Sequence, residues 1–228
     1  MKIAILAGIV VGPLMVFAQL HALSKDAGLL YFGTAVSPGD SRDAAYYKLQ
    51  NDIKNFGQYT PDNAQKWDAI QPSRGQFSYG QADSIVSRAL TNKMLMRCHT
   101  LVWYSQLPGW GVFSRDSLDC LHSRHELTAW CHNVVSSGSW TKDTMTAVMQ
   151  SHISNVMGHF KGKCYAWDVI NEALEDNGTY RNNPFLKALG DSYFALSFKF
   201  AAAADPSAKL YYNDCNSMPP WHLPTPYR

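Results

Sequence analysis

The chain has no strong excess of charge of either sign. Of its 228 residues, 20 are Lys or Arg and 18 are Asp or Glu, so the formal net charge is +2. Proteins that bind nucleic acids need many basic groups to neutralise phosphates, and disordered tails carry blocks of like charge. The composition therefore argues against a nucleic-acid partner. Apolar residues make up 46% of the chain, enough for one sizeable hydrophobic core.

The motifs of several common enzyme classes are also missing. The sequence has no Gly-rich phosphate loop, no G-x-S-x-G elbow, no H-E-x-x-H motif and no internal repeat. Aromatic residues are well represented, with 7 Trp and 12 Tyr. Because flat rings pack in protein cores and also suit the apolar faces of sugars, both uses stay open.

Only one long apolar run is present, at the beginning of the chain. After Lys2, residues 3–18 carry no charge, and small residues follow at Ala18 and Ala22. The run is shorter than the ~20 residues of a membrane-spanning helix, and its basic start and small-residue exit are typical of a secretory signal peptide. We therefore predict a signal peptide over residues 1–22 and a secreted, extracellular mature chain over 23–228 without a membrane anchor.

Secretion would place the five cysteines in an oxidising compartment, which favours disulfides. They are Cys98, Cys120, Cys131, Cys164 and Cys215. An odd number leaves at least one of them free or paired with another molecule, and the sequence leaves the pairing open. Three histidines lie near Cys120 and Cys131, but their spacing matches no zinc-binding template, so we predict no metal site.

Predicted strands and helices alternate along the chain. We expect strands at 30–36, 56–60, 94–104, 165–170 and 210–212, and helices at 41–56, 79–93, 141–159 and 184–204. Ser41 is the expected N-cap of the first helix, and Gly190 is expected to interrupt the last. This alternation predicts a parallel sheet with crossover helices.

Polar side chains follow four consecutive predicted strands, where parallel α/β barrels carry their active sites. They are Asp62, Asn63 and Lys66; His99, Trp103, Tyr104 and Gln106; Asn171 and Glu172; and Asn213 and Asp214. A single such residue is usually a helix cap or a paired core residue, but four sets in succession indicate a site. Glu172 beside Asn171 suits glycoside hydrolysis, in which a carboxylic acid protonates the leaving oxygen and a hydrogen bond holds the sugar 2-hydroxyl.

Five collinear stretches resemble a known family. They are YFGTA (31–35), TPDNAQKWDAIQPSRGQFSY (60–79), HTLVWYSQLP (99–108), GKCYAWDVINEALEDNG (162–178) and ADPSAKLYYNDCN (204–216). The chain resembles glycoside hydrolase family 10, whose members are mostly endo-1,4-β-xylanases. The resemblance implies an α/β fold, the (β/α)8 TIM barrel. Such a barrel takes about 250 residues, and five predicted strands correspond to an incomplete barrel of about five βα units.

The resemblance also implies a retaining mechanism with two glutamates, acting on the 1,4-β-D-xylosidic linkages of xylan without a metal or organic cofactor. Glu172 matches the acid/base and Asn171 the neighbour that holds the sugar. Four residues match the subsite just before the cleaved bond, and Gln106 belongs to the same stretch as two of them. The four are Asn63, Lys66, His99 and Trp103. The folded chain is expected to be a monomer.

Several positions depart from the pattern of the family. Asp62 stands where Glu is usual, Cys98 where Gly is usual and Tyr104 where His is usual. The nucleophile of the family, a Glu after the seventh strand, has no counterpart, since no Glu follows Glu175. Asp214 is a weaker alternative, because its side chain is short and its strand adjoins the fourth. A carbohydrate-binding remnant without turnover and an endo-glucanase on the same scaffold stay open as alternatives.

Two segments have no place in the pattern of the family. Residues 111–133 separate two stretches that the family joins almost directly, and either a genuine loop or a retained intron explains them. Residues 217–228 contain four prolines and form an atypical tail. Separately, Asn177-Gly178-Thr179 is a sequon for N-glycosylation near the predicted substrate cleft.

Overall fold

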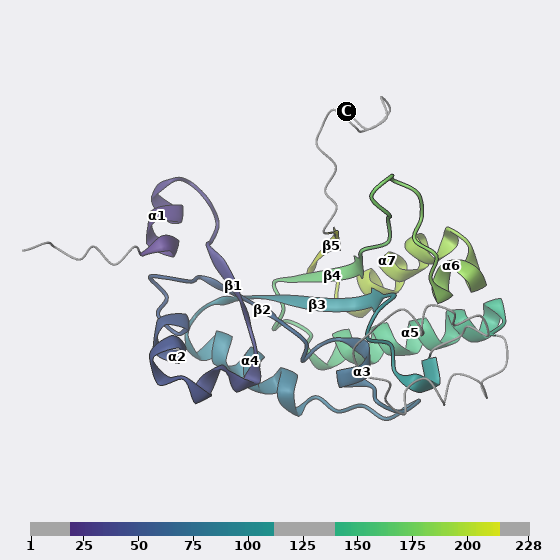
Figure 1. Ribbon diagram of the computed structural model, residues 1–228, viewed down its shortest axis with the longest axis horizontal. Coiled ribbons are helices and arrows are strands. Elements are labelled where there is room, and N and C mark those ends of the chain that lie inside the picture. Colours follow the sequence, from purple (N-terminus) through teal and green to yellow (C-terminus); the bar gives the residue numbers. More distant parts are fainter. Residues whose placement is uncertain (1–18, 112–139, 215–228) are drawn as a thin grey trace, which may run out of the picture.

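The computed structural model describes residues 19–111 and 140–214, and its centre is one parallel sheet (Figure 1). Its five strands lie side by side in the order of the sequence. They are β1 (Gly33–Val36), β2 (Gln58–Pro61), β3 (Leu95–Trp103), β4 (Ala166–Asn171) and β5 (Lys209–Asn213). The predicted parallel sheet of about five βα units is confirmed.

Helices connect the strands and cover the sheet. They are α1 (Leu20–Asp26), α2 (Ala44–Gln50), α3 (Trp67–Ile70), α4 (Gly80–Thr91), α5 (Lys142–His159), α6 (Pro184–Leu189) and α7 (Ser192–Ala204), with 3-10 turns η1 (Pro38–Arg42) and η2 (Gly109–Gly111). Helix α4 contacts β2 and β3, α5 contacts β3, and α7 contacts β4 and β5. In Figure 1, α4 and α5 lie below the strands.

The hydrophobic core lies between these helices and the sheet. All six residues of β4 are buried. The stripe predicted for residues 141–159 is buried on α5 at Met145, Val148, Met149, His152, Ile153, Val156 and Met157. Because these positions repeat at three- and four-residue steps, they all fall on the face that meets the sheet and α7.

The strand register aligns the carboxyl ends of the central strands. In β3 and β4, Trp103 lies opposite Asn171. In β4 and β5, Asn171 lies opposite Asn213. The residues that follow these strands therefore lie together at the carboxyl-terminal end of the sheet.

Helix boundaries test two local predictions, one right and one wrong. Gly190 separates α6 from α7 with φ +62, a conformation that favours glycine, as predicted. Ser41, the predicted N-cap, instead lies inside η1. The cap of α2 is Asp43, whose carboxylate accepts hydrogen bonds from the amides of Ala45 and Tyr46 at 3.0 Å each. A carboxylate at a helix N-terminus satisfies free amides and also suits the helix dipole.

Helices α1 and α3 were not predicted from the sequence. Helix α1 spans the predicted boundary at residue 22, and the amide of His21 donates to the carbonyl of Lys54 at 3.0 Å. The rest of the predicted signal peptide, nearly all of the insertion at 111–133 and the tail at 217–228 lie outside the described residues. None of the helices within 19–111 and 140–214 has the length and hydrophobicity that crossing a bilayer requires.

A disulfide that the sequence left open joins two neighbouring strands. Cys98 in β3 is bonded to Cys164, two residues before β4, with the two Cα atoms 5.8 Å apart. The bond links positions 66 residues apart in the chain. The other three cysteines lie outside the described residues.

Candidate active site

The predicted acid/base residue lies at the carboxyl end of β4 and contacts the end of β3. Trp103 Nε1 donates a hydrogen bond to Glu172 Oε2 at 2.9 Å. Glu172 has φ +50, a left-handed conformation that is uncommon for a residue with a side chain. Its backbone is held by neighbours, because its amide donates to the Asn213 carbonyl at 2.8 Å and its carbonyl accepts from Arg181 Nε at 3.1 Å. The surrounding structure thus holds Glu172 in this conformation.

A lysine and an asparagine from the segment after β2 join the same place. Lys66 Nζ donates to Asn63 Oδ1 at 2.8 Å and lies 4.6 Å from the centroid of the Trp103 ring. Burial lowers the pKa of Lys66, while the nearby carboxylates of Asp62, Asp68 and Glu172 partly oppose this shift. The arrangement places a buried lysine beside an aromatic ring, with carboxylates nearby.

His99 is oriented by a buried carboxylate that the sequence analysis missed. Asp168 Oδ2 lies 2.9 Å from His99 Nδ1, and Asp168 is only 2% exposed. Arg97 donates to Asp168 Oδ1 through Nε at 2.9 Å and through Nη2 at 2.7 Å. This hydrogen bonding raises the pKa of Arg97. Since a carboxylate accepts the bond from Nδ1, His99 keeps Nε2 for another partner.

The two asparagines at the ends of β4 and β5 are linked as well. Asn213 Nδ2 donates to Asn171 Oδ1 at 2.7 Å, and Arg97 Nη2 donates to Asn213 Oδ1 at 3.3 Å. A cavity of about 400 Å³ is lined by residues of all five strands, among them Arg97, His99, Asp168 and Asn213. The structure therefore places polar groups from β3, β4 and β5 around one hollow.

Two of the other predicted residues face different contacts. Gln106 has φ +48, and its carbonyl accepts a hydrogen bond from the amide of Asp68 at 3.0 Å. This contact is made by the backbone of Gln106 and not by its side chain. Asp214 accepts a hydrogen bond from the Tyr212 hydroxyl and a longer one, 3.4 Å, from the amide of Leu174. Burial and then the bond to Asp214 raise the pKa of Tyr212. The Asp214 carboxylate thus holds the loop after Glu172.

Two of the residues that depart from the pattern of the family, Asp62 and Tyr104, also contact other side chains. Asp62 Oδ2 accepts from the Ser37 hydroxyl at 3.2 Å. The guanidinium of Arg181 lies 4.7 Å from the centroid of the Tyr104 ring, and Arg181 Nη2 donates to the Leu174 carbonyl at 3.0 Å. Arg181 was missed from the sequence, where it is one basic residue in a polar loop.

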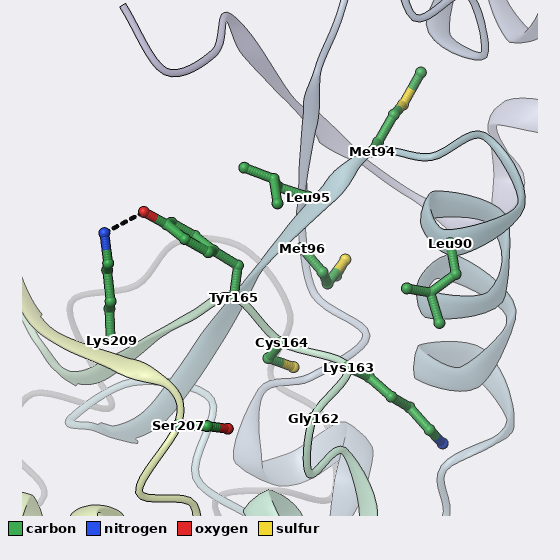
Figure 2. A pocket seen from close by; sticks show the side chains of 10 residues that line it. All are labelled: Leu90, Met94, Leu95, Met96, Gly162, Lys163, Cys164, Tyr165, Ser207 and Lys209. Atoms are coloured by element: carbon green, nitrogen blue, oxygen red, sulfur yellow. Dashed lines mark hydrogen bonds between the residues drawn. The ribbon is translucent and has the colours of Figure 1, made fainter.

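A second cavity, of about 310 Å³, lies at the opposite ends of the strands. Figure 2 shows that its lining combines Leu90 with residues at or just before the starts of β3, β4 and β5. Lys209 donates to the Tyr165 hydroxyl there, and no carboxylate is among its lining residues. It offers no group that transfers a proton to a glycosidic oxygen.

The described part of the chain contains no candidate metal-binding site. Within residues 19–111 and 140–214, no group of three or more His, Cys, Asp or Glu side chains is arranged to hold a metal ion. The three histidines near Cys120 and Cys131 lie outside these ranges.

The chain is similar in sequence to fungal xylanases. The profile of the family described as Glycosyl hydrolase family 10 matches residues 19–222. Endo-1,4-beta-xylanase 1 of Humicola insolens is 50% identical over 200 residues, covering 87% of this chain and 41% of that protein. Endo-1,4-beta-xylanase D of Talaromyces funiculosus is 46% identical over 199 residues, covering 87% and 43%. The chain spans less than half the length of these relatives.

Solved structures of xylanases share the same fold. The GH10 xylanase from Bispora sp. MEY-1, solved with xylobiose, is 33% identical with a TM-score of 0.73, covering 85% of this chain and 54% of that one. The endo-1,4-beta-xylanase XylE of Penicillium canescens is also 33% identical with a TM-score of 0.71, covering 86% and 53%. The five strands thus correspond to about half of such a structure.

Proposed function

The chain belongs to glycosyl hydrolase family 10, and on this basis we propose that it is a secreted xylan-active protein carrying the acid/base half of an endo-1,4-β-xylanase site. Its substrate is the 1,4-linked β-D-xylose chain, and Glu172 is the proton donor. The observation that carries the proposal is the hydrogen bond from Trp103 Nε1 to Glu172 Oε2 at 2.9 Å. It ties the carboxyl group to the ring beside Lys66.

The hydrogen bond supports one choice of oxygen for the proposed proton transfer. Trp103 Nε1 donates to Oε2, which leaves Oε1 to carry the acidic proton in the proposed mechanism. In a retaining mechanism Oε1 gives its proton to the leaving glycosidic oxygen. The resulting carboxylate then takes a proton from the water that releases the sugar.

The neighbouring polar groups suit the binding of one sugar ring. Lys66 offers donors that are not used by Asn63, and His99 offers Nε2 while Asp168 holds its other nitrogen. In the proposed complex, Asn171 bonds the sugar 2-hydroxyl, an interaction that strengthens in the transition state. No metal or organic cofactor enters this scheme.

A second candidate function is binding of xylan without cleavage. A retaining mechanism needs a second carboxylate about 5–5.5 Å from the first. Asp214, the carboxylate that follows β5, accepts hydrogen bonds from the Tyr212 hydroxyl and the Leu174 amide. This observation favours binding of the polysaccharide without turnover by the described residues.

One experiment on the full chain tests the proposal and separates the candidates. Xylo-oligosaccharide binding is measured by calorimetry, and the release of reducing ends is measured on xylan and on β-glucan. We expect binding to xylo-oligosaccharides that falls at least about tenfold in Lys66→Met, since a charge-assisted hydrogen bond is lost. The matched control is Asp176→Asn, an exposed residue of the loop after Glu172, which should bind as the parent does.

The outcomes are distinct. Release of reducing ends that disappears in Glu172→Gln supports catalysis, and binding without release supports the second candidate. Release that persists in Glu172→Gln would show that another residue is the acid. Faster release from β-glucan than from xylan would replace the xylanase by an endo-glucanase.

A further inference from the structure

The loop that follows Glu172 is a tight hairpin whose tip carries the sequon. Leu174 pairs antiparallel with Tyr180. The Glu175 amide donates to the Thr179 carbonyl and the Gly178 amide donates to the Glu175 carbonyl, each at 2.8 Å. Gly178 has φ +80, which glycine adopts without strain. In Figure 1 the green loop between β4 and α6 rises clear of the helices.

Asn177 at this tip has its amide nitrogen available. Its side-chain oxygen, Oδ1, accepts hydrogen bonds from the Thr179 amide at 3.0 Å and from the Thr179 hydroxyl at 2.6 Å. In the described part of the chain, Asn177 Nδ2 makes no hydrogen bond, and the residue is exposed. Two donors on Oδ1 withdraw electron density through the amide and make the Nδ2 protons more acidic. The hydrogen bonds of the turn itself lie within residues 175–179.

Asn213 provides a contrast within the same molecule. It begins Asn213-Asp214-Cys215, a second sequence of the N-x-S/T/C type, whereas Asn177-Gly178-Thr179 is the one N-x-S/T sequon of the chain. Asn213 Nδ2 donates to Asn171 Oδ1 at 2.7 Å, and Asn213 Oδ1 accepts from Arg97. Asn213 Nδ2 is therefore already engaged within the described structure, whereas Asn177 Nδ2 is not.

We propose that Asn177 is an N-glycosylation site and that its glycan stands at the rim of the substrate site. The donor is a lipid-linked oligosaccharyl diphosphate. Asn177 Nδ2 forms a bond to C1 of the first sugar, the bond between C1 and the phosphate oxygen breaks, the lipid diphosphate leaves with the electron pair, and the amide loses one proton. This step depends on the secretion included in the proposed function but not on xylan binding or cleavage.

The glycan is held close to the acid/base residue by the geometry of the loop. Asn177 lies five residues after Glu172, a contour of at most about 18 Å. Arg181, which follows the second arm of the hairpin, binds the first arm through the carbonyls of Glu172 and Leu174. Tyr180 is 53% exposed next to the sequon, and it offers an apolar ring that a sugar can cover.

The test is translation of the full chain with endoplasmic-reticulum microsomes, once with its own N-terminus and once with residues 1–18 replaced by an established cleavable leader. Import is scored by protection from protease, and glycosylation by a slower band on gels that endoglycosidase H removes. We expect the slower band for the parent chain, Thr179→Ser and Asn213→Gln. It should disappear in Asn177→Gln and Thr179→Ala, and tandem mass spectrometry should place the sugar on Asn177.

The controls separate the site from the assumption of secretion. Import without a slower band, or a band that survives in Asn177→Gln, would overturn the site. If the chain is imported with the substitute leader but not with its own N-terminus, the secretion on which the site depends would be overturned. Neither result bears on xylan binding, which is measured independently.

Discussion

The centre of the sheet and its edge differ sharply, although both are built from short parallel strands. Strand β4 has a neighbour on each side and all six of its residues are buried. Strand β5 is the last in the sheet, and its Tyr211 and Tyr212 are 41% and 38% exposed. Trp103 and Glu172 belong to the packed centre, whereas Asp214 follows the exposed edge. We therefore expect the side chain of Glu172, in the centre, to be held more rigidly than the side chain of Asp214, at the edge.

The largest expected effect concerns a histidine buried in the packed region. His152 on α5 stacks on Trp67, with ring centroids 3.7 Å apart, and its Nδ1 lies 2.9 Å from Gln71 Oε1. That oxygen also accepts from Trp67 Nε1, so Nδ1 carries the proton. His152 Nε2 is buried and has no hydrogen-bond partner in the described structure. Burial lowers the pKa of His152 to about 3.

This histidine makes the packed centre sensitive to acid. The pKa is about 6.5 in the unfolded chain, so the unfolded state binds a proton first as the pH falls. The neutral histidine contributes stability above pH 6.5, and this is lost progressively toward pH 3. We expect the free energy of unfolding to fall by about 3 kcal/mol between pH 7 and pH 4 from this group, and by about 5 kcal/mol in total at lower pH.

Urea denaturation of the parent chain and of His152→Gln across this range measures the effect. Glutamine can still donate to Gln71 but does not titrate, so the difference in stability between the two proteins should shrink as the pH falls. Parallel pH profiles for the two proteins would mean that His152 does not control acid unfolding.

The next effect concerns the disulfide that fastens β3 to the start of β4. Closing a loop between residues 66 positions apart restricts the unfolded chain. The chain-entropy model gives about 4 kcal/mol for a loop of this length. We expect Cys98→Ala/Cys164→Ala to lose a stability of this order in urea denaturation. Cys120→Ala/Cys131→Ala is the matched control, since it removes two cysteines and leaves the described bond intact.

A loss below about 1 kcal/mol in the first double variant would contradict this prediction. It would show that the β3–β4 ladder and the helices over it hold the centre without the cross-link. The contrast between centre and edge would then rest on packing alone.

The elements predicted best from the sequence are those with strong local patterns. Strand β3 follows from its apolar run, α5 from its periodic stripe and the break at Gly190 from one glycine. Ser41 failed as a cap because another acceptor, Asp43, lies two residues later, and short-range preferences do not rank such neighbours. Local pattern thus locates an element better than it locates its first residue.

Contacts between residues distant in sequence account for the missing parts of the site. Asp168 is a charged residue inside an apolar strand, and its role depends on Arg97, 71 positions away. The Cys98–Cys164 bond likewise depends on the pairing of two strands. Glu172, Trp103, Lys66 and Asn63 were anticipated through the family resemblance, and the structure brings them together. Their roles in catalysis and binding remain predictions.

The smallest expected effect is the loss of a helix N-cap, which can be compared between α5 in the packed region and α2 at the periphery. Thr141 Oγ1 accepts from the Thr144 amide at 3.2 Å at the start of α5, and Asp43 caps α2. Removing either cap, by Thr141→Ala or Asp43→Ala, costs about 1 kcal/mol of helix stability. Because α5 packs against β3, α6 and α7, the loss there should appear in the global free energy of unfolding.

Helix α2 should respond differently to the loss of its cap. It has seven residues and keeps Leu49 47% exposed, so it can open while the centre stays folded. Asp43→Ala should therefore speed hydrogen exchange of the α2 amides with a smaller change in global stability. Thr141→Ser and Asp43→Asn retain a capping oxygen and serve as controls. Equal global losses in the two alanine variants would mean that centre and periphery unfold as one unit, and the contrast between them would then be one of exposure rather than of stability.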